Sequence, residues 1–418
     1  MVKRHLVLGC GPAGLKAADK IRETNGDYEI KLVSMEDSLP YCPASLPYLL
    51  AGRIREEDLW LRDEDYFLKK GISFTKGKQA VRVLPDKKCV IYKDGDVDEY
   101  DALLIATGAE TSTPHIEGLK DINILNFRTL TDYLRLNSML SSKTVVAIIG
   151  AGMVAIEIAM ALVERGINVK IIGRGRPLRS YFDEQPGTYI ADILTKYGIQ
   201  ITTGKKLVTA RQLKDSIEVV SDDGQVFEAN LLINCSGVTP RISFVEGSGI
   251  KINQGIVVDS QLGANISGIF AAGDVAEAPD FFHGLMGISA ILPSATDQGR
   301  IAGENMSGKN NNYKGWIPMN LVNLFDKTIC SLGLHKPRKS EGIIMEEKDD
   351  EKRYFKRLVF EEGELVGAMF VNSEIEPGII RYLIEHKVKV GRYKELLFYE
   401  TNDVSHWLML ENEKHKTA

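Results

Sequence analysis

A cluster of three glycines stands near the N-terminus, between two segments of different period. It reads GCGPAG at residues 9–14, after the apolar run HLVL at 5–8 and before the helical pattern LKAADKIRE at 15–23. In this context the first glycine permits a tight turn, the second lets the backbone approach a pyrophosphate, and the third lets helix and strand pack closely. The positive end of the helix then faces the phosphates. The cluster therefore predicts a turn that binds the ADP part of a dinucleotide.

A carboxylate stands where the ribose of such a dinucleotide would lie. The β-branched run EIKLVSME at 29–36 ends at Glu36, about 20 residues after the third glycine. A carboxylate at this place can accept hydrogen bonds from ribose hydroxyls. Strand, glycine turn, helix, strand and acid together are typical of a dinucleotide-binding βαβ unit.

The same unit recurs at residues 145–174. Gly150 and Gly152 form its turn, Ala155 replaces the third glycine, and no acid follows the second strand NVKII at 168–172. Arg174 and Arg176 stand there instead, and an arginine can pair with the 2′-phosphate of NADPH. This feature favours NADPH and leaves NADH open. Two units predict two dinucleotide sites.

The cysteines offer no spacing typical of a disulfide framework or a metal site. The five are Cys10, Cys42, Cys89, Cys235 and Cys330, and no CxxC occurs. Zinc sites and protein-held iron–sulfur clusters need closer ligands, so we expect no metal. A chain without paired cysteines suits a reducing compartment, and we expect a cytoplasmic protein.

Length and composition indicate a soluble chain of several domains. It has 418 residues, enough for roughly two or three domains, with 44% hydrophobic and 26% charged residues. The 52 basic and 57 acidic residues give a net charge of −5, which argues against nucleic-acid binding. The apolar segment 144–163 is long enough to cross a membrane, but Gly150 and Gly152 interrupt it where a strand would turn into a helix. We therefore expect no membrane span.

Further motifs follow in a fixed order: ALLIATGAE at 102–110, INCSGVTPR at 233–241, GIVVD at 255–259, IFAAGDVAE at 269–277 and ATDQGRIAGEN at 295–305. This series resembles the FAD-dependent pyridine nucleotide–disulfide oxidoreductases with two dinucleotide-binding domains. The resemblance covers residues 2–310 and continues more weakly to about residue 372. Its nearest branch holds the rubredoxin and ferredoxin reductases and the NADH-dependent flavoprotein subunits.

The resemblance implies an α/β fold with two Rossmann-like domains, one for FAD and one for NAD(P)H, and a C-terminal α+β interface domain. The expected division is 1–112 and 241–312 for the FAD domain, 113–240 for the NAD(P)H domain and 313–418 for the interface domain. In the last of these, RYFKRLVFEEGELVGAMFV at 353–371 alternates around Glu362-Gly363 and predicts a β-hairpin. The interface domain pairs two subunits in the family, so a homodimer or a subunit of a hetero-complex is expected.

The resemblance also implies site residues. Asp274 would hold the ribityl or pyrophosphate part of FAD, the helix starting near Ala295 would direct its positive end at the flavin, and Glu157 would lie near the nicotinamide. The expected FAD residues are Gly9, Gly11, Pro12, Ala13, Gly14, Glu36, Ala44, Val81, Ala106, Thr107, Gly108, Gly273, Asp274 and Ala295. Those expected for NAD(P)H are Gly150, Gly152, Met153, Val154, Ala155, Glu157, Arg174, Arg176 and Gly237.

The family divides by its thiol chemistry, and Cys42 in PYCPASLPYLLAG at 40–52 is the residue in question. It has no partner in a CxxxxC pair, which excludes the mechanism of glutathione and lipoamide reductases. Coenzyme A-disulfide reductases and NADH peroxidases use one cysteine shortly before a Leu-Pro-Tyr. Aligning that motif with 46–48 without gaps puts Ala44 at the thiol position and Cys42 two residues upstream.

Rubredoxin and ferredoxin reductases read Pro-Tyr-Ser-Arg-Pro in this stretch and lack the thiol. Pro40-Tyr41-Cys42 matches its first half, although Pro43-Ala44 replaces Arg-Pro. We favour this thiol-free alternative, in which NAD(P)H reduces FAD and electrons pass to or from rubredoxin, ferredoxin or an iron–sulfur subunit. Two alternatives stay open: a reductase of CoA disulfide, polysulfide or peroxide with Cys42 as its catalytic thiol, and a flavin-holding scaffold without turnover.

Overall fold

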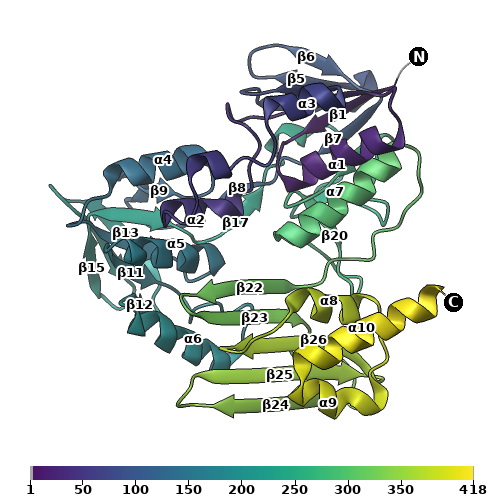
Figure 1. Ribbon diagram of the computed structural model, residues 1–418. Coiled ribbons are helices and arrows are strands. Elements are labelled where there is room, and N and C mark those ends of the chain that lie inside the picture. Colours follow the sequence, from purple (N-terminus) through teal and green to yellow (C-terminus); the bar gives the residue numbers. More distant parts are fainter. Residues whose placement is uncertain (1–2, 418) are drawn as a thin grey trace. The chain divides into compact units, whose positions relative to one another are not determined.

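The computed structural model describes residues 3–417, and the side chains of residues 3–414. The chain forms two compact units, each drawn in Figure 1. The first unit comprises Met1–Ser112, Arg128–Leu134 and Gly237–Trp316. The second comprises Thr113–Phe127, Arg135–Ser236 and Ile317–Ala418, and α4 (Leu130–Met139) begins in one unit and ends in the other. The domain boundaries expected from the sequence stay a prediction.

The first unit is built on a parallel five-stranded sheet. Its order is β19-β7-β1-β2-β3, where β1 is Arg4–Leu8, β2 Glu29–Val33, β3 Ile72–Thr75, β7 Ala102–Ile105 and β19 Ile269–Ala271. The central strands β1 and β7 are almost wholly buried, as expected for a parallel sheet covered on both faces, whereas the outer strand β3 is more exposed. The strand β2 ends at Val33, three residues before Glu36, so Glu36 lies in the loop beyond the sheet.

Two helices of the first unit pack side by side, α1 (Pro12–Thr24) and α7 (Leu292–Met306) (Figure 1). A Cβ atom on Gly299 would lie 2.2 Å from the carbonyl oxygen of Ala13, so only glycine allows this approach. The helix α7 begins at Leu292, three residues earlier than the sequence suggested, with Pro293 in its first turn. The two helices therefore reach the same end of the sheet together.

The remaining elements of the first unit are short. They are the meander β4 (Ala80–Leu84), β5 (Cys89–Tyr92) and β6 (Val97–Glu99), the pair β8 (Ala109–Thr111) and β17 (Val238–Pro240), the strands β18 (Ile256–Val257), β20 (Ala276–Pro279) and β21 (Met286–Gly287), and the helices α2 (Leu46–Leu50) and α3 (Glu64–Lys70). A 3₁₀ turn, η1 (Pro43–Ser45), precedes α2.

The second unit repeats the Rossmann-like arrangement. Its parallel sheet has the order β12-β11-β10-β16-β9, where β9 is Leu125–Asn126, β10 Val145–Ile149, β11 Asn168–Ile172, β12 Gln200–Thr202 and β16 Leu231–Asn234. The helices α5 (Met153–Glu164) and α6 (Glu184–Lys196) and the antiparallel strands β13 (Leu207–Gln212), β14 (Ile217–Ser221) and β15 (Val226–Ala229) complete it. The apolar segment 144–163 is thus β10 and most of α5. Within residues 3–417 no helix is both long and apolar enough to cross a membrane.

The C-terminal part of the second unit is an antiparallel sheet with helices. Its order is β22-β23-β26-β25-β24, where β22 is Met319–Leu324, β23 Lys327–Gly333, β24 Ile343–Asp349, β25 Tyr354–Glu361 and β26 Glu364–Val371. The helices are α8 (Pro377–Glu385), α9 (Lys394–Tyr399) and α10 (Thr401–Thr417). Glu362 and Gly363 have φ of 50° and 79°, which is the geometry of a tight hairpin turn, so the predicted hairpin is confirmed. The expected α/β fold with two Rossmann-like parts and an α+β C-terminal part is confirmed as well.

Candidate functional site

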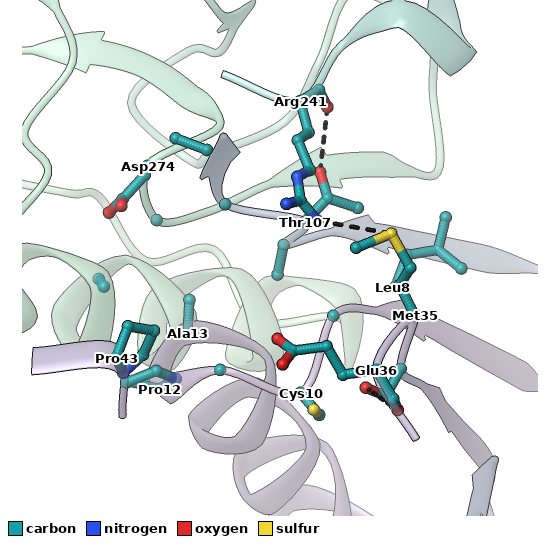
Figure 2. Close-up of a pocket in the computed structure, with 18 of the residues that line it drawn as sticks. Leu8, Cys10, Pro12, Ala13, Met35, Glu36, Pro43, Thr107, Arg241 and Asp274 are labelled. Carbon is teal, nitrogen blue, oxygen red and sulfur yellow. Dashed lines mark hydrogen bonds between the residues drawn. The ribbon is translucent and has the colours of Figure 1, made fainter. Parts of the chain in front are cut away.

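A cavity of about 370 Å³ lies in the first unit, where the carboxyl ends of its parallel strands meet the start of α1. Most of the residues predicted to bind FAD line it (Figure 2). They are Gly9, Gly11, Pro12, Ala13, Glu36, Ala44, Ala106, Thr107, Gly108, Gly273, Asp274 and Ala295. Segments that are far apart in sequence therefore converge on one cavity.

The first glycine turn has the shape that a pyrophosphate requires. Gly9 has φ of 106°, and a Cβ there would lie 2.1 Å from the carbonyl oxygen of Ala106. At Gly11, by contrast, a Cβ would meet nothing within 4 Å and would project into open space. No side chain caps the N-terminus of α1, and its first turn holds no acid. The helix N-terminus without a side-chain cap and the open space beside Gly11 fit a bound phosphate.

Two predicted FAD residues do not line the cavity. Gly14 lies beneath it, where a Cβ would be 1.9 Å from the carbonyl oxygen of Gly9, so its role is the close packing of helix on strand. Val81 is 43% exposed, because successive side chains of a strand point to opposite faces and its neighbour Ala80 faces the cavity. Ala80 lines the cavity in its place.

Glu36 is fixed by a tyrosine that the sequence analysis did not select. The hydroxyl of Tyr41 donates to Glu36 Oε2 at 2.8 Å and accepts from the N–H of Leu130 at 2.7 Å. Burial, with the nearby carboxylate, raises the pKa of Tyr41, so the hydroxyl stays a donor. The carboxylate expected to bind a ribose is therefore held in one position.

Asp274 has a partner, Arg128, which was also missed. Arg128 Nη2 lies 2.5 Å from Asp274 Oδ2, and both side chains line the cavity. Figure 2 shows Asp274 on one side of the cavity and Glu36 on the other, near Cys10. Although it is paired with Asp274, Arg128 puts a positive charge in the cavity lining, where the phosphates of a dinucleotide are expected. In the sequence, Arg128 stands two residues before α4 in a segment without a glycine motif, so no pattern predicted it as a site residue.

A second arginine, Arg241, lies at the Glu36 side of the cavity. Its carbonyl accepts from Thr107 Oγ1 at 3.2 Å, and its Nη1 lies 3.5 Å from Met35 Sδ (Figure 2). The two contacts connect β7 and β2 to the chain after β17. Arg241 ends the segment INCSGVTPR, whose pattern did not predict it as a site residue.

Cys42 and Ala44 both line the cavity, so the position that gap-free spacing assigned and the cysteine itself are both there. Cys42 is 8% exposed and directly precedes η1, where its carbonyl accepts from the N–H of Ser45 at 2.9 Å. Burial raises the pKa of the Cys42 thiol, and the charge of Asp274 adds to this. A backbone hydrogen bond from Ala44 and the charge of Arg128 partly offset it.

The second glycine turn reproduces the first. A Cβ on Gly150 would lie 2.3 Å from the carbonyl oxygen of Cys235, whereas a Cβ on Gly152 would meet nothing within 4 Å. Ala155 is fully buried beneath the turn, and Met153 and the 40% exposed Val154 begin α5. The open space at Gly152 again suits a pyrophosphate, and we expect the nicotinamide dinucleotide here.

Glu157 lies one turn into α5 from this glycine turn. Burial raises the pKa of its carboxyl from 4.5 to about 7. The group therefore gains or loses its proton near neutral pH. Gly237, predicted for the same site, belongs to the first unit, where its carbonyl accepts from the N–H of Ser112 at 3.0 Å.

The two arginines after β11 differ in their surroundings. Arg174 is exposed, whereas Arg176 donates through Nη2 to the carbonyl of Phe182 at 2.6 Å. A Cβ on Gly187 would lie 2.5 Å from Nη1 of Arg176, so this guanidinium packs against α6. Arg176 thus supports its own loop, whereas Arg174 extends into solvent, as does Arg179 farther along the loop. Of the two arginines predicted from the sequence, Arg174 is the one still expected to pair with a 2′-phosphate.

Known proteins agree with this geometry. Residues 3–299 match the family model for pyridine nucleotide-disulphide oxidoreductase, and residues 318–388 match the rubredoxin NAD+ reductase C-terminal domain. The chain is 31% identical over 385 residues to the NADH-dependent phenylglyoxylate dehydrogenase subunit epsilon of Aromatoleum evansii, covering 91% of each chain.

Two solved structures resemble the chain in fold. A ferredoxin reductase from Rhodopseudomonas palustris has a TM-score of 0.80 at 25% identity, over 88% of this chain and 91% of its own. An NAD-dependent persulfide reductase from A. fulgidus has a TM-score of 0.82 at 25% identity, over 93% of this chain and 77% of its own. The chain thus belongs to the pyridine nucleotide-disulphide oxidoreductases, and it is an NAD(P)H-dependent oxidoreductase whose cofactors are FAD and NAD(P)H.

Proposed function

We propose that this oxidoreductase passes electrons between NAD(P)H and a second redox protein without an active-site thiol. Bound FAD supplies the chemistry, since it accepts a hydride and can release its electrons one at a time. The partner that we propose is a rubredoxin, a ferredoxin or the iron–sulfur subunit of a larger complex. One observation carries the proposal: Cys42 is buried, and its burial raises the pKa of the thiol.

A thiol serves as a redox group when its thiolate is stabilised by a cation or a helix N-terminus. Burial is the largest influence on the Cys42 thiol and raises its pKa, and the charge of Arg128, which is paired with Asp274, offsets this only in part. Cys42 is the N-cap residue of the 3₁₀ turn η1, but the turn is three residues long and the Cys42 side chain makes no capping hydrogen bond to it. Cys10, the other cysteine in the lining, has its pKa raised by burial as well. Both thiols therefore stay protonated at neutral pH.

The similarities support a protein partner. The C-terminal match is to a domain of rubredoxin NAD+ reductase, and the Aromatoleum relative is named as one subunit of a dehydrogenase. A hetero-complex or a homodimer is thus the expected assembly. Light scattering of the purified protein, alone and with a candidate partner, distinguishes the two.

A second candidate function has one observation in its favour. Cys42 lines the cavity even though gap-free spacing puts it two residues from the thiol position of single-cysteine enzymes. In this alternative the protein reduces CoA disulfide, polysulfide, persulfide or peroxide through Cys42. The likeness to a persulfide reductase is consistent with it.

An anaerobic titration of the flavoprotein with NADH and then NADPH separates the candidates. We expect the flavin to bleach at one donor per FAD, without a long-wavelength thiolate–flavin band, and we expect Cys42→Ser to titrate identically. Cys89→Ser, a buried cysteine in β5 outside the cavity lining, is the matched control. A long-wavelength band that needs more than one donor and disappears in Cys42→Ser alone would contradict the proposal.

Turnover with a partner is the second part of the test. NADH-dependent reduction of a purified rubredoxin or ferredoxin should proceed in Cys42→Ser at a rate within about twofold of the wild type. A flavin that NADH and NADPH reduce only slowly would instead favour the scaffold alternative.

A further inference from the structure

The loop between β11 and α6, residues 173–183, lies against the second glycine turn. The N–H of Leu178 donates to the carbonyl of Ala151 at 2.9 Å, within that turn. Arg176 closes the loop internally through its contact with the carbonyl of Phe182. The position of the loop and the position of the glycine turn are therefore coupled.

The far end of this loop is held by the C-terminal sheet. Asp183 precedes α6 as its N-cap residue, yet its side chain makes no capping hydrogen bond to its own helix. Its Oδ2 pairs with Arg357 Nη1 and its Oδ1 lies 3.3 Å from His335 Nδ1. An aspartate at this position usually satisfies the N–H groups of the helix. Here the carboxylate faces the neighbouring sheet instead.

Both partners of Asp183 are themselves fixed. Arg357, on β25, donates through Nε and Nη2 to Glu346 Oε2 at 2.8 and 2.7 Å, across to β24. His335 Nε2 lies 3.1 Å from Ser331 Oγ on β23. Ser331, His335 and Asp183 therefore contact one another in series. Because Ser331 is only 3% exposed, a substrate cannot reach its hydroxyl, and we assign these contacts a structural role.

The rest of α6 is also held by this sheet, beside which it lies in Figure 1. Gln185 and Tyr189 contact Asp350, and Asp192 pairs with Arg353 at 2.7 Å. The polar contacts extend over more than one turn of the helix. The Asp183 end is the one that continues into the loop.

We propose that Asp183, Arg357 and His335 position loop 173–183 for binding of the adenosine end of the nicotinamide dinucleotide. Asp183 ends the loop, Arg357 lies on β25, and His335 follows β23. All three are positioning residues, and they act on the glycine turn through the hydrogen bond of Leu178. The proposal rests on the placement of NAD(P)H at Gly150 and Gly152.

The test is NAD+ binding to the purified holoprotein by calorimetry, together with steady-state kinetics. In Asp183→Asn the Kd for NAD+ should rise about fivefold, the KM for NADH should rise equally, and kcat should not change. Arg357→Gln should raise the Kd by the same factor, and Arg357→Lys should raise it about half as much. The Kd of the double variant Asp183→Asn/Arg357→Gln should be no higher than that of either single variant. Asp192→Asn is the matched control, since it removes an ion pair on the same helix away from the loop.

Three results decide the matter. A Kd within twofold of wild type in both Asp183→Asn and Arg357→Gln, with melting temperatures like that of Asp192→Asn, would overturn the positioning role. Equal losses of affinity in Asp192→Asn would also overturn it, because general destabilisation would then explain them. Gly152→Val tests the premise separately: normal NAD+ binding in that variant would remove the second turn as the nicotinamide site, and with it this proposal.

Discussion

We expect the half-buried carboxyl of Glu157 to make the stability of the second unit depend on pH. Burial raises its pKa from 4.5 to about 7, so the folded protein holds this proton more tightly than the unfolded chain does. The resulting stabilisation is fully present below pH 4.5, decreases as the pH rises, and is lost above about pH 7. Glu157→Gln cannot ionise and removes this dependence.

The size of the effect follows from the shift. One pKa unit corresponds to about 1.4 kcal/mol, and between pH 5 and pH 8 the shift yields about 2.5 kcal/mol. Because the side chain is partly exposed, we expect the variant to gain about 2 kcal/mol over the wild type across this range. For a unit of this size that corresponds to about 5 °C in melting temperature.

Thermal melting of wild type and Glu157→Gln at pH 5, 6, 7 and 8 measures the effect. The two curves should converge at low pH, and the variant should melt higher at pH 8. Glu351→Gln, which replaces an exposed glutamate of the same unit, should follow the wild type at every pH. Parallel pH profiles for wild type and Glu157→Gln would refute the argument, because they would mean that Glu157 ionises normally in the folded protein.

Three further changes test the first unit. Gly11→Val should fold, since a Cβ at Gly11 meets nothing within 4 Å, but should be purified with little FAD, as the ratio of flavin to protein absorbance will report. Tyr41→Phe releases Glu36 and leaves the N–H of Leu130 without its partner, so FAD should dissociate about tenfold more readily, which equilibrium dialysis against FAD measures. Gly299→Ala places a Cβ 2.2 Å from a backbone carbonyl of α1 and should lower the melting temperature by several degrees; an unchanged melting curve would contradict the packing of α1 on α7.

Several features followed from the sequence because they depend on local geometry. The two glycine turns, the strand–helix boundaries around them and the hairpin at Glu362-Gly363 are each determined by neighbouring residues, since glycine alone adopts the turn and period separates strand from helix. The family resemblance supplied most of the other predicted residues of the cavity lining. Val81, predicted for FAD, lies outside that lining, and the neighbouring Ala80 lies within it.

Contacts between distant segments were decided by the tertiary structure. Arg128 and Asp274 are 146 positions apart, and Asp183 and Arg357 are 174 apart, so no local pattern relates either pair. The pKa of Cys42 was likewise decided by the tertiary structure, because its burial and the charges around it come from segments that meet only in the folded chain. The sequence by itself therefore determined the two glycine turns, whose steric requirements lie within a few residues. Only the tertiary structure decided which charges and thiols surround them, because desolvation and ion pairing depend on which side chains come together.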